Sequence, residues 1–143
     1  MKNLSSVLVV LDKPKHAQTA LARAKERQAK SGCHLSLAAF VVEHSRVLTD
    51  LDLIDTRKVR KQHVERNKAL VEGLTSPYGV VKSRIHMPVG KVGQVVNATA
   101  RKIDADLIVL GTAARRGIGA RLLGNSAERI LSCAPCDVLV VHP

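Results

Sequence analysis

The residues best suited to chemistry lie between positions 106 and 130, in the stretch DLIVLGTAARRGIGARLLGNSAERI. A short apolar run rich in branched side chains stops at Gly111, which predicts a buried parallel strand and then a turn that glycine permits. Gly124 precedes Asn125, and the spacing of Asn125 and Glu128 is that of a capping box. The pattern predicts a strand, a glycine-bearing loop and the start of a helix.

The loop between these two glycines is basic. Arg115, Arg116 and Arg121 lie in it, and no acidic residue occurs before Glu128. The free backbone N–H groups and the positive dipole end of the following helix attract phosphate. The loop is therefore a candidate anion-binding site, although an ordinary capped helix with solvated loop arginines would show the same pattern.

The stretch resembles the signature of the universal stress protein family, G-x2-G-x9-G-[S/T], with which nucleotide-binding members wrap the phosphates of ATP. Gly111 and Gly124 match the first and third glycines. Ala114 replaces the second glycine and Asn125 replaces the Ser/Thr, with Ser126 one place later. The form GTxxRxGxxxxxLGNxAE is similar to the tandem-domain branch of the family, in which ATP binding is not the rule.

The resemblance covers nearly the whole chain and implies a ligand and a site. In nucleotide-binding relatives the positions that match Asp12 and Val41 border adenine and ribose, and the first and fourth strands are adjacent. Asp12 would then lie opposite the Gly111 loop, and Arg115 and Arg116 would contact the phosphates. The implied cofactor is ATP or a related adenine nucleotide. The resemblance also implies a homodimer, because the strand that matches Val138–Val141 pairs with its twofold mate in relatives.

The elements that must position this loop are strands and helices in alternation. Apolar runs predict strands at Val7–Leu11, Leu35–Val42, Val80–Met87, Asp106–Leu110 and Asp137–Val141. Helical spacing predicts helices over Pro14–Ser31, Gly90–Ile103 and Ala127–Ala134, with a mobile loop and a further helix in Glu43–Leu74. This order predicts a doubly wound, Rossmann-like α/β fold, in which a five-stranded parallel sheet carries helices on both faces. Residues 1–143 are expected to form one domain.

Composition limits the remaining possibilities. The chain has 143 residues, its only aromatic side chains are Phe40 and Tyr78, and the core must therefore be aliphatic. The apolar stretch near the N-terminus is too short to span a membrane and lacks a small-residue cleavage site, which predicts a cytoplasmic protein. Three cysteines, an odd number, suit reduced thiols better than a disulfide framework.

The formal charge of +11 favours anionic partners. The densest basic run, Arg57–Lys68, holds six basic residues and Glu65. Nucleic acid is one interpretation, but almost no aromatic side chains are available to stack on bases, and no reading motif is present. We therefore expect a solvated basic helix face and no specific nucleic-acid binding. An acidic protein partner remains open.

Evidence for catalysis is weak. Cys133-Ala134-Pro135-Cys136 forms a CxxC, but no second pair of metal ligands has matching spacing. No metal-spaced histidine pair, nucleophile or general base can be placed, so we expect no enzyme activity, with slow ATP hydrolysis left open. Two functions remain: a stress-response module that binds an adenine nucleotide, and a non-ATP adaptor of the same fold that binds another anion or an acidic protein. The first is preferred.

Overall fold

The computed structural model describes residues 4–11, 14–38, 61–62, 65, 68–69, 71–73, 76–80, 84–86, 91–111 and 125–142. The strands in these ranges are β1 (Ser6–Val10), β2 (His34–Ala38), β3 (Ile85–His86), β4 (Leu107–Gly111) and β5 (Asp137–Val141). They form one sheet of five strands in the order β3-β2-β1-β4-β5, and every neighbouring pair is parallel. The predicted five-stranded parallel sheet is confirmed.

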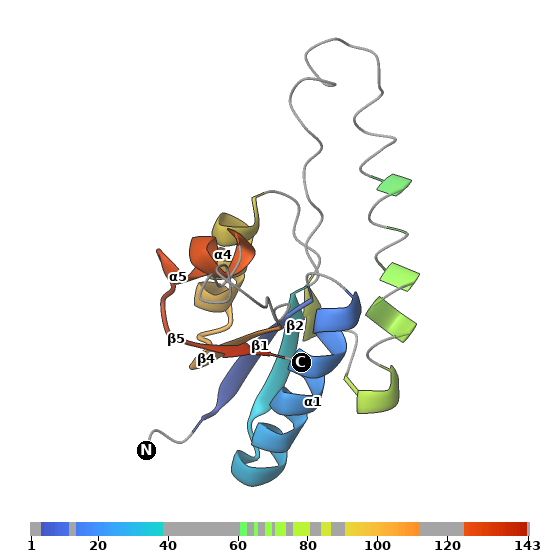
Figure 1. Cartoon of the computed structure of the whole chain (residues 1–143). Helices are drawn as coiled ribbons and strands as arrows, with labels where there is room; N and C mark the ends of the chain where they lie inside the picture. Colours follow the sequence, from blue (N-terminus) through green and yellow to red (C-terminus); the bar gives the residue numbers. More distant parts are fainter. Residues whose placement is uncertain are drawn as a thin grey trace.

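Helices cover both faces of the sheet (Figure 1). The helix α1 (Pro14–Ser31) packs on one face, while α4 (Val92–Lys102) and α5 (Asn125–Leu131) pack on the other, and a 3₁₀ turn, η1, covers Ser76–Tyr78. Parallel strands linked by helical crossovers require this arrangement, since right-handed crossovers before and after the change of direction fall on opposite faces. The predicted layers are therefore confirmed.

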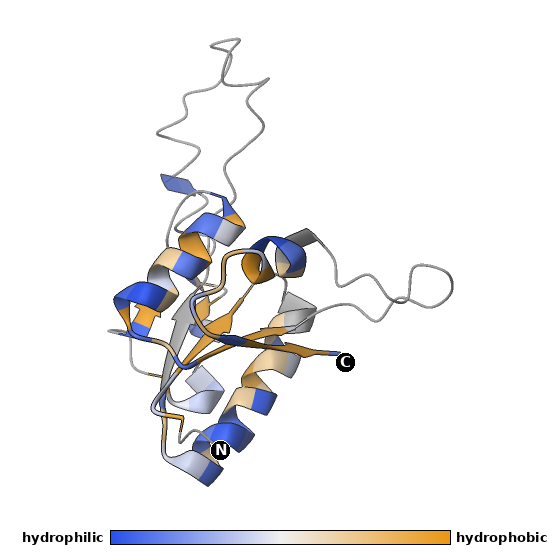
Figure 2. Ribbon diagram, turned by 90° about the vertical axis from the view of Figure 1, so that its left-hand side faces the viewer, coloured by the Kyte–Doolittle hydropathy of each residue, from blue (hydrophilic) through white to orange (hydrophobic). Residues whose placement is uncertain are grey.

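Two aliphatic cores follow from the alternation of side chains along the central strands. In β1, Val7 and Val9 pack in the core that contains α1, whereas Leu8 and Val10 pack in the core that contains α4 and α5. The neighbouring β4 alternates in the same way, and all five of its residues are buried. Figure 2 shows the consequence, with hydrophobic colour on the strands and hydrophilic colour on the outer faces of the helices. Branched side chains buried on both faces are typical of a central parallel strand.

The helices α4 and α5 approach each other closely where their side chains are small. A Cβ atom on Gly93 would lie only 2.8 Å from the backbone oxygen of Arg129. The side chain of Asn97, 2% exposed, donates a hydrogen bond of 3.1 Å from Nδ2 to the backbone oxygen of Ile130. This bond satisfies a carbonyl in the last turn of α5, which has no partner within its own helix. Together these contacts fix α5, the helix that follows the predicted binding loop.

Several predicted boundaries differ from the observed ones. The helix after the loop ends at Leu131 rather than Ala134, because Pro135 disfavours helical geometry in the preceding residue and the Cys133 N–H bonds to the Ile130 carbonyl at 3.4 Å in a tighter turn. The observed β2 begins one residue early, at His34, and the predicted extension over 39–42 lies outside the described residues. Of the strand predicted at Val80–Met87, the structure assigns Ile85–His86 to β3.

The region from 43 to 74 is described only in part. Residues 39–60 lie outside the description, so the predicted loop stays a prediction. The described residues at 61–62, 65, 68–69 and 71–73 are all helical, which agrees with the predicted helix. Val71 is buried in the α1 core, whereas Lys61, Glu65 and Lys68 are exposed. The charged residues of the basic run that the structure describes are therefore exposed.

Candidate functional site

The predicted site lies at the carboxyl ends of β1 and β4. These strands are neighbours, with Val10 in register with Leu110 at their ends. From β1 the chain continues to β2 and β3 on one side, and then crosses to β4 and β5 on the other. A change of direction between adjacent parallel strands leaves a crevice beyond their carboxyl ends, where ligands of doubly wound sheets bind. The predicted adjacency of the first and fourth strands is confirmed.

Gly111 ends β4 at this switch point. It is buried and lies in register with Val141 of β5, and Leu11, the residue directly after β1, is also buried. The other predicted ligands Asp12, Val41, Ala114, Arg115, Arg116 and Gly124 lie outside the described residues. Their contacts with a nucleotide stay predictions. What the structure places is the frame of the site, namely the ends of β1 and β4 and the beginning of α5.

Asn125 and Ser126 open α5, and Glu128 lies in its first turn. Gly124 and the side chains of Asn125 and Ser126 lie outside the description, so the predicted capping box stays a prediction.

Asp106 ties β1 and β4 together at the opposite end of the sheet. Its Oδ2 accepts hydrogen bonds from the Ser5 N–H at 2.9 Å, the Ser5 hydroxyl at 2.6 Å and the Ser6 N–H at 3.0 Å. The Asp106 N–H in turn donates to the Ser6 carbonyl at 2.8 Å. One carboxylate thus fixes the start of β1, 100 residues away in sequence, beside the start of β4. The register that aligns Val10 with Leu110 begins here.

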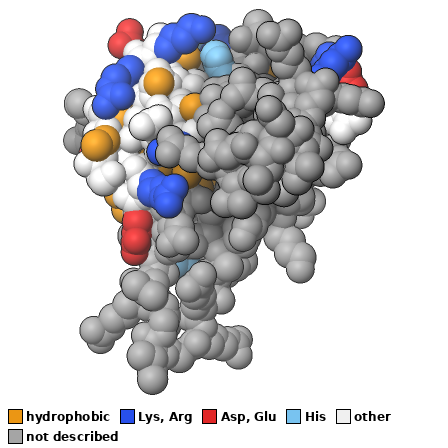
Figure 3. Space-filling model, turned by 90° about the horizontal axis from the view of Figure 1, so that it is seen from above, with side chains coloured by type: hydrophobic (Ala, Val, Ile, Leu, Met, Phe, Trp, Pro, Cys, Tyr) orange, Lys and Arg blue, Asp and Glu red, His pale blue; other side chains and the backbone are white. Residues whose placement is uncertain are grey.

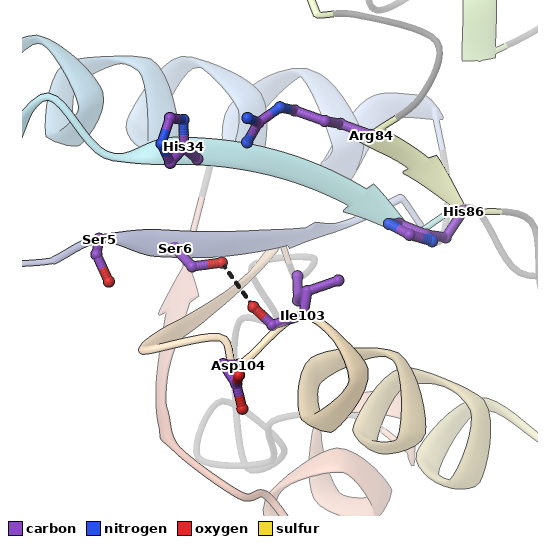
Figure 4. A pocket seen from close by; sticks show the side chains of 7 residues that line it. All are labelled: Ser5, Ser6, His34, Arg84, His86, Ile103 and Asp104. Carbon is purple, nitrogen blue, oxygen red and sulfur yellow. Dashed lines mark hydrogen bonds between the residues drawn. The ribbon is translucent and has the colours of Figure 1, made fainter.

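A groove that sequence reasoning missed opens on the α4 face of the sheet. We call it the β2 groove; it has a volume of about 390 Å³ and is lined by Ser5, Ser6, His34, Arg84, His86, Ile103 and Asp104. Figure 4 shows the Arg84 side chain reaching back along β2 towards His34, with His86 near the end of β2. The signal available in the sequence was the pair Arg84 and His86, which lie two residues apart in the strand predicted at Val80–Met87.

His86 has a lowered pKa. Burial disfavours its charged form most, and the positive charge of Lys102 lowers the pKa further. Because the pKa in the folded protein lies below the ordinary value of 6.5, the unfolded chain binds a proton more readily than the native protein as the pH falls. The stabilisation from neutral His86 is therefore complete above pH 6.5 and is lost as the pH falls below it.

We expect His86→Gln to reduce the loss of stability on acidification. Urea unfolding of the two proteins between neutral pH and pH about 5 would measure the difference, since each unit of pKa shift corresponds to about 1.4 kcal/mol. The same change at His142, which is exposed after β5, controls for the loss of a histidine as such. Parallel pH profiles for wild type and His86→Gln would contradict the assignment.

The other chemical candidates form no disulfide or metal cluster among the described residues. None of the three cysteines is in a disulfide, and Cys33 is buried, Cys133 exposed and Cys136 half-buried. Within the described ranges, no group of three or more His, Cys, Asp or Glu side chains could hold a metal ion. Among the helices of the same ranges, none is long and apolar enough to cross a membrane.

Basic residues are spread over the described surface. Seen from above (Figure 3), Lys and Arg side chains lie at several separate places, with acidic side chains among them. On α1, Arg23 and Arg27 are exposed, and Arg23 forms an ion pair of 3.7 Å with Glu26. Scattered charges of this kind raise the general attraction for anions without defining one binding surface.

Comparison with known proteins assigns the chain to a family. Residues 4–142 match the model of the universal stress protein family. The chain is 34% identical over 138 residues to universal stress protein A homolog 1 of Coxiella burnetii, with 94% of each chain covered. It is 35% identical over 85 residues to universal stress protein E of Escherichia coli, but that match spans 59% of this chain and only 26% of the relative.

A solved structure shows the same fold. A universal stress protein crystallised in complex with cAMP matches with a TM-score of 0.59 and 23% identity, over 99% of this chain and 98% of the other. The observed fold, with its switch point between β1 and β4, and the match along residues 4–142 lead to the same assignment. This chain belongs to the universal stress protein family.

Proposed function

We propose that this chain is a stress-response module that binds ATP or a related adenine nucleotide at the carboxyl ends of β1 and β4. The observation that carries the proposal is the adjacency of these strand ends, with Gly111 closing β4 at the switch point. Family membership supports it, as does the cAMP complex of a relative with the same fold. Nucleotide phosphates would meet the backbone after Gly111 together with Arg115 and Arg116, and the base would lie towards Asp12 and Val41.

We infer further that the module acts in the cytoplasm as a homodimer, without enzyme activity beyond slow hydrolysis of ATP. A non-ATP adaptor is the second candidate. Ala114 and Asn125, which depart from the nucleotide-binding signature, favour it, and so does the similarity to universal stress protein E. In that case the basic surface would bind another anion or an acidic protein. The two functions differ in whether adenine nucleotide binds the loop.

Nucleotide titration tests the proposal. We expect Ala114→Gly to tighten ATP binding, because a glycine at this position lets the backbone approach phosphate without the extra methyl group. Arg115→Ala combined with Arg116→Ala should weaken binding by about tenfold or more, since a hydrogen bond to a charged group contributes about 1.5–3 kcal/mol. Asp12→Ala should lower the preference for adenine. Isothermal titration with ATP, ADP and GTP measures all three effects.

The matched control is Arg23→Ala combined with Arg27→Ala. This pair removes the same charge from the exposed face of α1, so it isolates the general electrostatic contribution. If wild type and Ala114→Gly both give no heat and no thermal shift with millimolar nucleotide, the nucleotide proposal is wrong and the adaptor proposal takes its place.

Dimerisation is proposed to occur through β5. This strand is at one edge of the described sheet, and Val138, Leu139 and Val140 are only half-buried. Successive residues of a strand direct their N–H groups to opposite edges of that strand. One of the two substitutions, Leu139→Pro or Val140→Pro, therefore removes an N–H group from the free edge of β5. That variant should give monomer by light scattering. Val140→Thr keeps both shape and N–H and should remain dimeric; an unchanged mass for both proline variants would count against this interface.

A further inference from the structure

None of the residues that line the β2 groove belongs to the proposed nucleotide site. Ser6 and His34, which begin β1 and β2, are in register with each other, whereas His86 is in register with Ala38 at the carboxyl end of β2. Ser6 has the same parity along β1 as Leu8 and Val10, whose side chains pack in the α4 core. The groove therefore lies on the α4 face and runs along β2 from the amino ends of β1 and β2 to His86.

The wall of the groove along β2 and β3 is basic. His34 is exposed, whereas Arg84 and His86 are half-buried. Figure 4 shows the guanidinium of Arg84 between the two imidazoles, above β2. Lys102, in the last turn of α4, is close enough to His86 to act on its charge. Asp104 is the one acidic residue among those that line the groove.

The opposite wall holds Asp104 and two serine hydroxyl groups. The Ser6 hydroxyl donates to the Ile103 carbonyl at 3.3 Å, and the Ser5 hydroxyl donates to Asp106 at 2.6 Å. The hydroxyl hydrogens of this wall are therefore engaged within the protein, and Arg84 and the two imidazoles are the donors on the other side of the groove. No ion pair of Arg84 is recorded among the described residues. An anion in the groove would supply the missing negative charge.

We propose that the β2 groove binds a small phosphate-bearing molecule, with Arg84 as the main ligand and His34 and His86 as flanking donors. A guanidinium pairs with two oxygens of an anion in a planar fork. A carboxylate has two oxygens, and both would bind the guanidinium. A terminal phosphate has a third oxygen that an imidazole can reach. The positive charge of Lys102, which acts on His86, and the guanidinium of Arg84 also favour a dianion over a monoanion.

The imidazole C2 protons of His34 and His86, followed by NMR in the full chain, report binding directly. Inorganic phosphate, glycerol 2-phosphate and acetate would be added in turn, with sodium chloride at matched ionic strength as the screening control. We expect saturable shifts of both histidines with the two phosphates, weaker ones with acetate, and none that saturate with chloride. Tighter binding of glycerol 2-phosphate than of inorganic phosphate would identify an organic phosphate as the ligand class, and the reverse order would identify free phosphate.

Arg84→Gln should weaken phosphate binding by about tenfold, since it removes a charged hydrogen-bonding group. Lys91→Gln removes the same charge from an exposed position before α4 and should change the affinity far less. His34→Gln, on the exposed rim, offers a second variant should Arg84→Gln disturb β3. Equal affinities for Arg84→Gln and Lys91→Gln would overturn the proposal.

The two sites are distinguished by the loop variant. Arg115→Ala combined with Arg116→Ala should leave the phosphate-induced shifts of His34 and His86 unchanged, whether or not the chain binds ATP. Loss of these shifts in the loop variant would place the phosphate at the loop instead, and the β2 groove would then have no ligand of this class.

Discussion

Asp106→Ala is expected to lower the free energy of unfolding by about 2–4 kcal/mol, the largest effect of any polar substitution proposed for this chain. The variant loses three hydrogen bonds to one carboxylate oxygen, two of which satisfy the backbone N–H groups of Ser5 and Ser6. Water can replace the exposed contacts with Ser5, so the total is smaller than the sum of three buried charged bonds. The part-buried Ser6 N–H would be left without its partner.

Urea unfolding followed by circular dichroism measures this loss. Asp106→Asn keeps an acceptor oxygen and should fall between wild type and alanine. Asp137→Ala, at an exposed residue that begins β5, is the matched control and should stay within about 0.5 kcal/mol of wild type. Equal stabilities for Asp106→Ala and Asp137→Ala would refute the role given to Asp106. Nucleotide affinity of the folded variant should be unchanged, because Asp106 lies at the far end of the sheet from Gly111.

Gly93→Ala is expected to destabilise the protein by about 1–2 kcal/mol, although alanine is the better helix former. The new Cβ would lie 2.8 Å from the Arg129 oxygen and 3.1 Å from the Arg129 carbonyl carbon, both backbone atoms of α5. Forcing the two helices apart costs about 1–3 kcal/mol, as other overpacked sites do. The gain in helix propensity, about 1 kcal/mol at most, offsets only part of this cost.

Gly73 provides the control for this prediction. It is also helical, but a Cβ atom there would meet nothing within 4 Å. Gly73→Ala should therefore leave stability unchanged or raise it by up to about 1 kcal/mol. Opposite signs for the two substitutions in thermal or urea unfolding would confirm that α5 contacts α4 at Gly93. If Gly93→Ala also stabilises, the close approach of the helices is wrong.

Much of the fold could be predicted from local patterns. The buried strands could be predicted because they are short, apolar and rich in branched side chains, and Gly111 marked the end of the fourth strand. The long helix α1 was predicted over Pro14–Ser31 and is observed there. Helix ends were less certain: the last helix was predicted to reach Ala134 but ends at Leu131, because a shift of a few residues at a helix end changes few of the apolar contacts that a pattern reveals.

The two candidate sites differ in how far the sequence could predict them. The basic loop between Gly111 and Gly124 is a local sequence feature, so residue types alone predicted an anion site there. The β2 groove unites Ser5, His34, Arg84 and Asp104 from four segments of the chain, and no spacing in the sequence could have predicted their meeting. The three bonds of Asp106 to Ser5 and Ser6 are equally non-local.

By itself the sequence determined most of the secondary structure and predicted the chemistry of the loop, because apolar periodicity and glycine conformations depend on neighbours along the chain. Tertiary structure alone decided which strands lie side by side, for hydrogen bonds between parallel strands form equally well in many orders. The burial of β1 and β4 on both faces selected the order β3-β2-β1-β4-β5. That order created both the switch point beside Gly111 and the basic wall of the β2 groove.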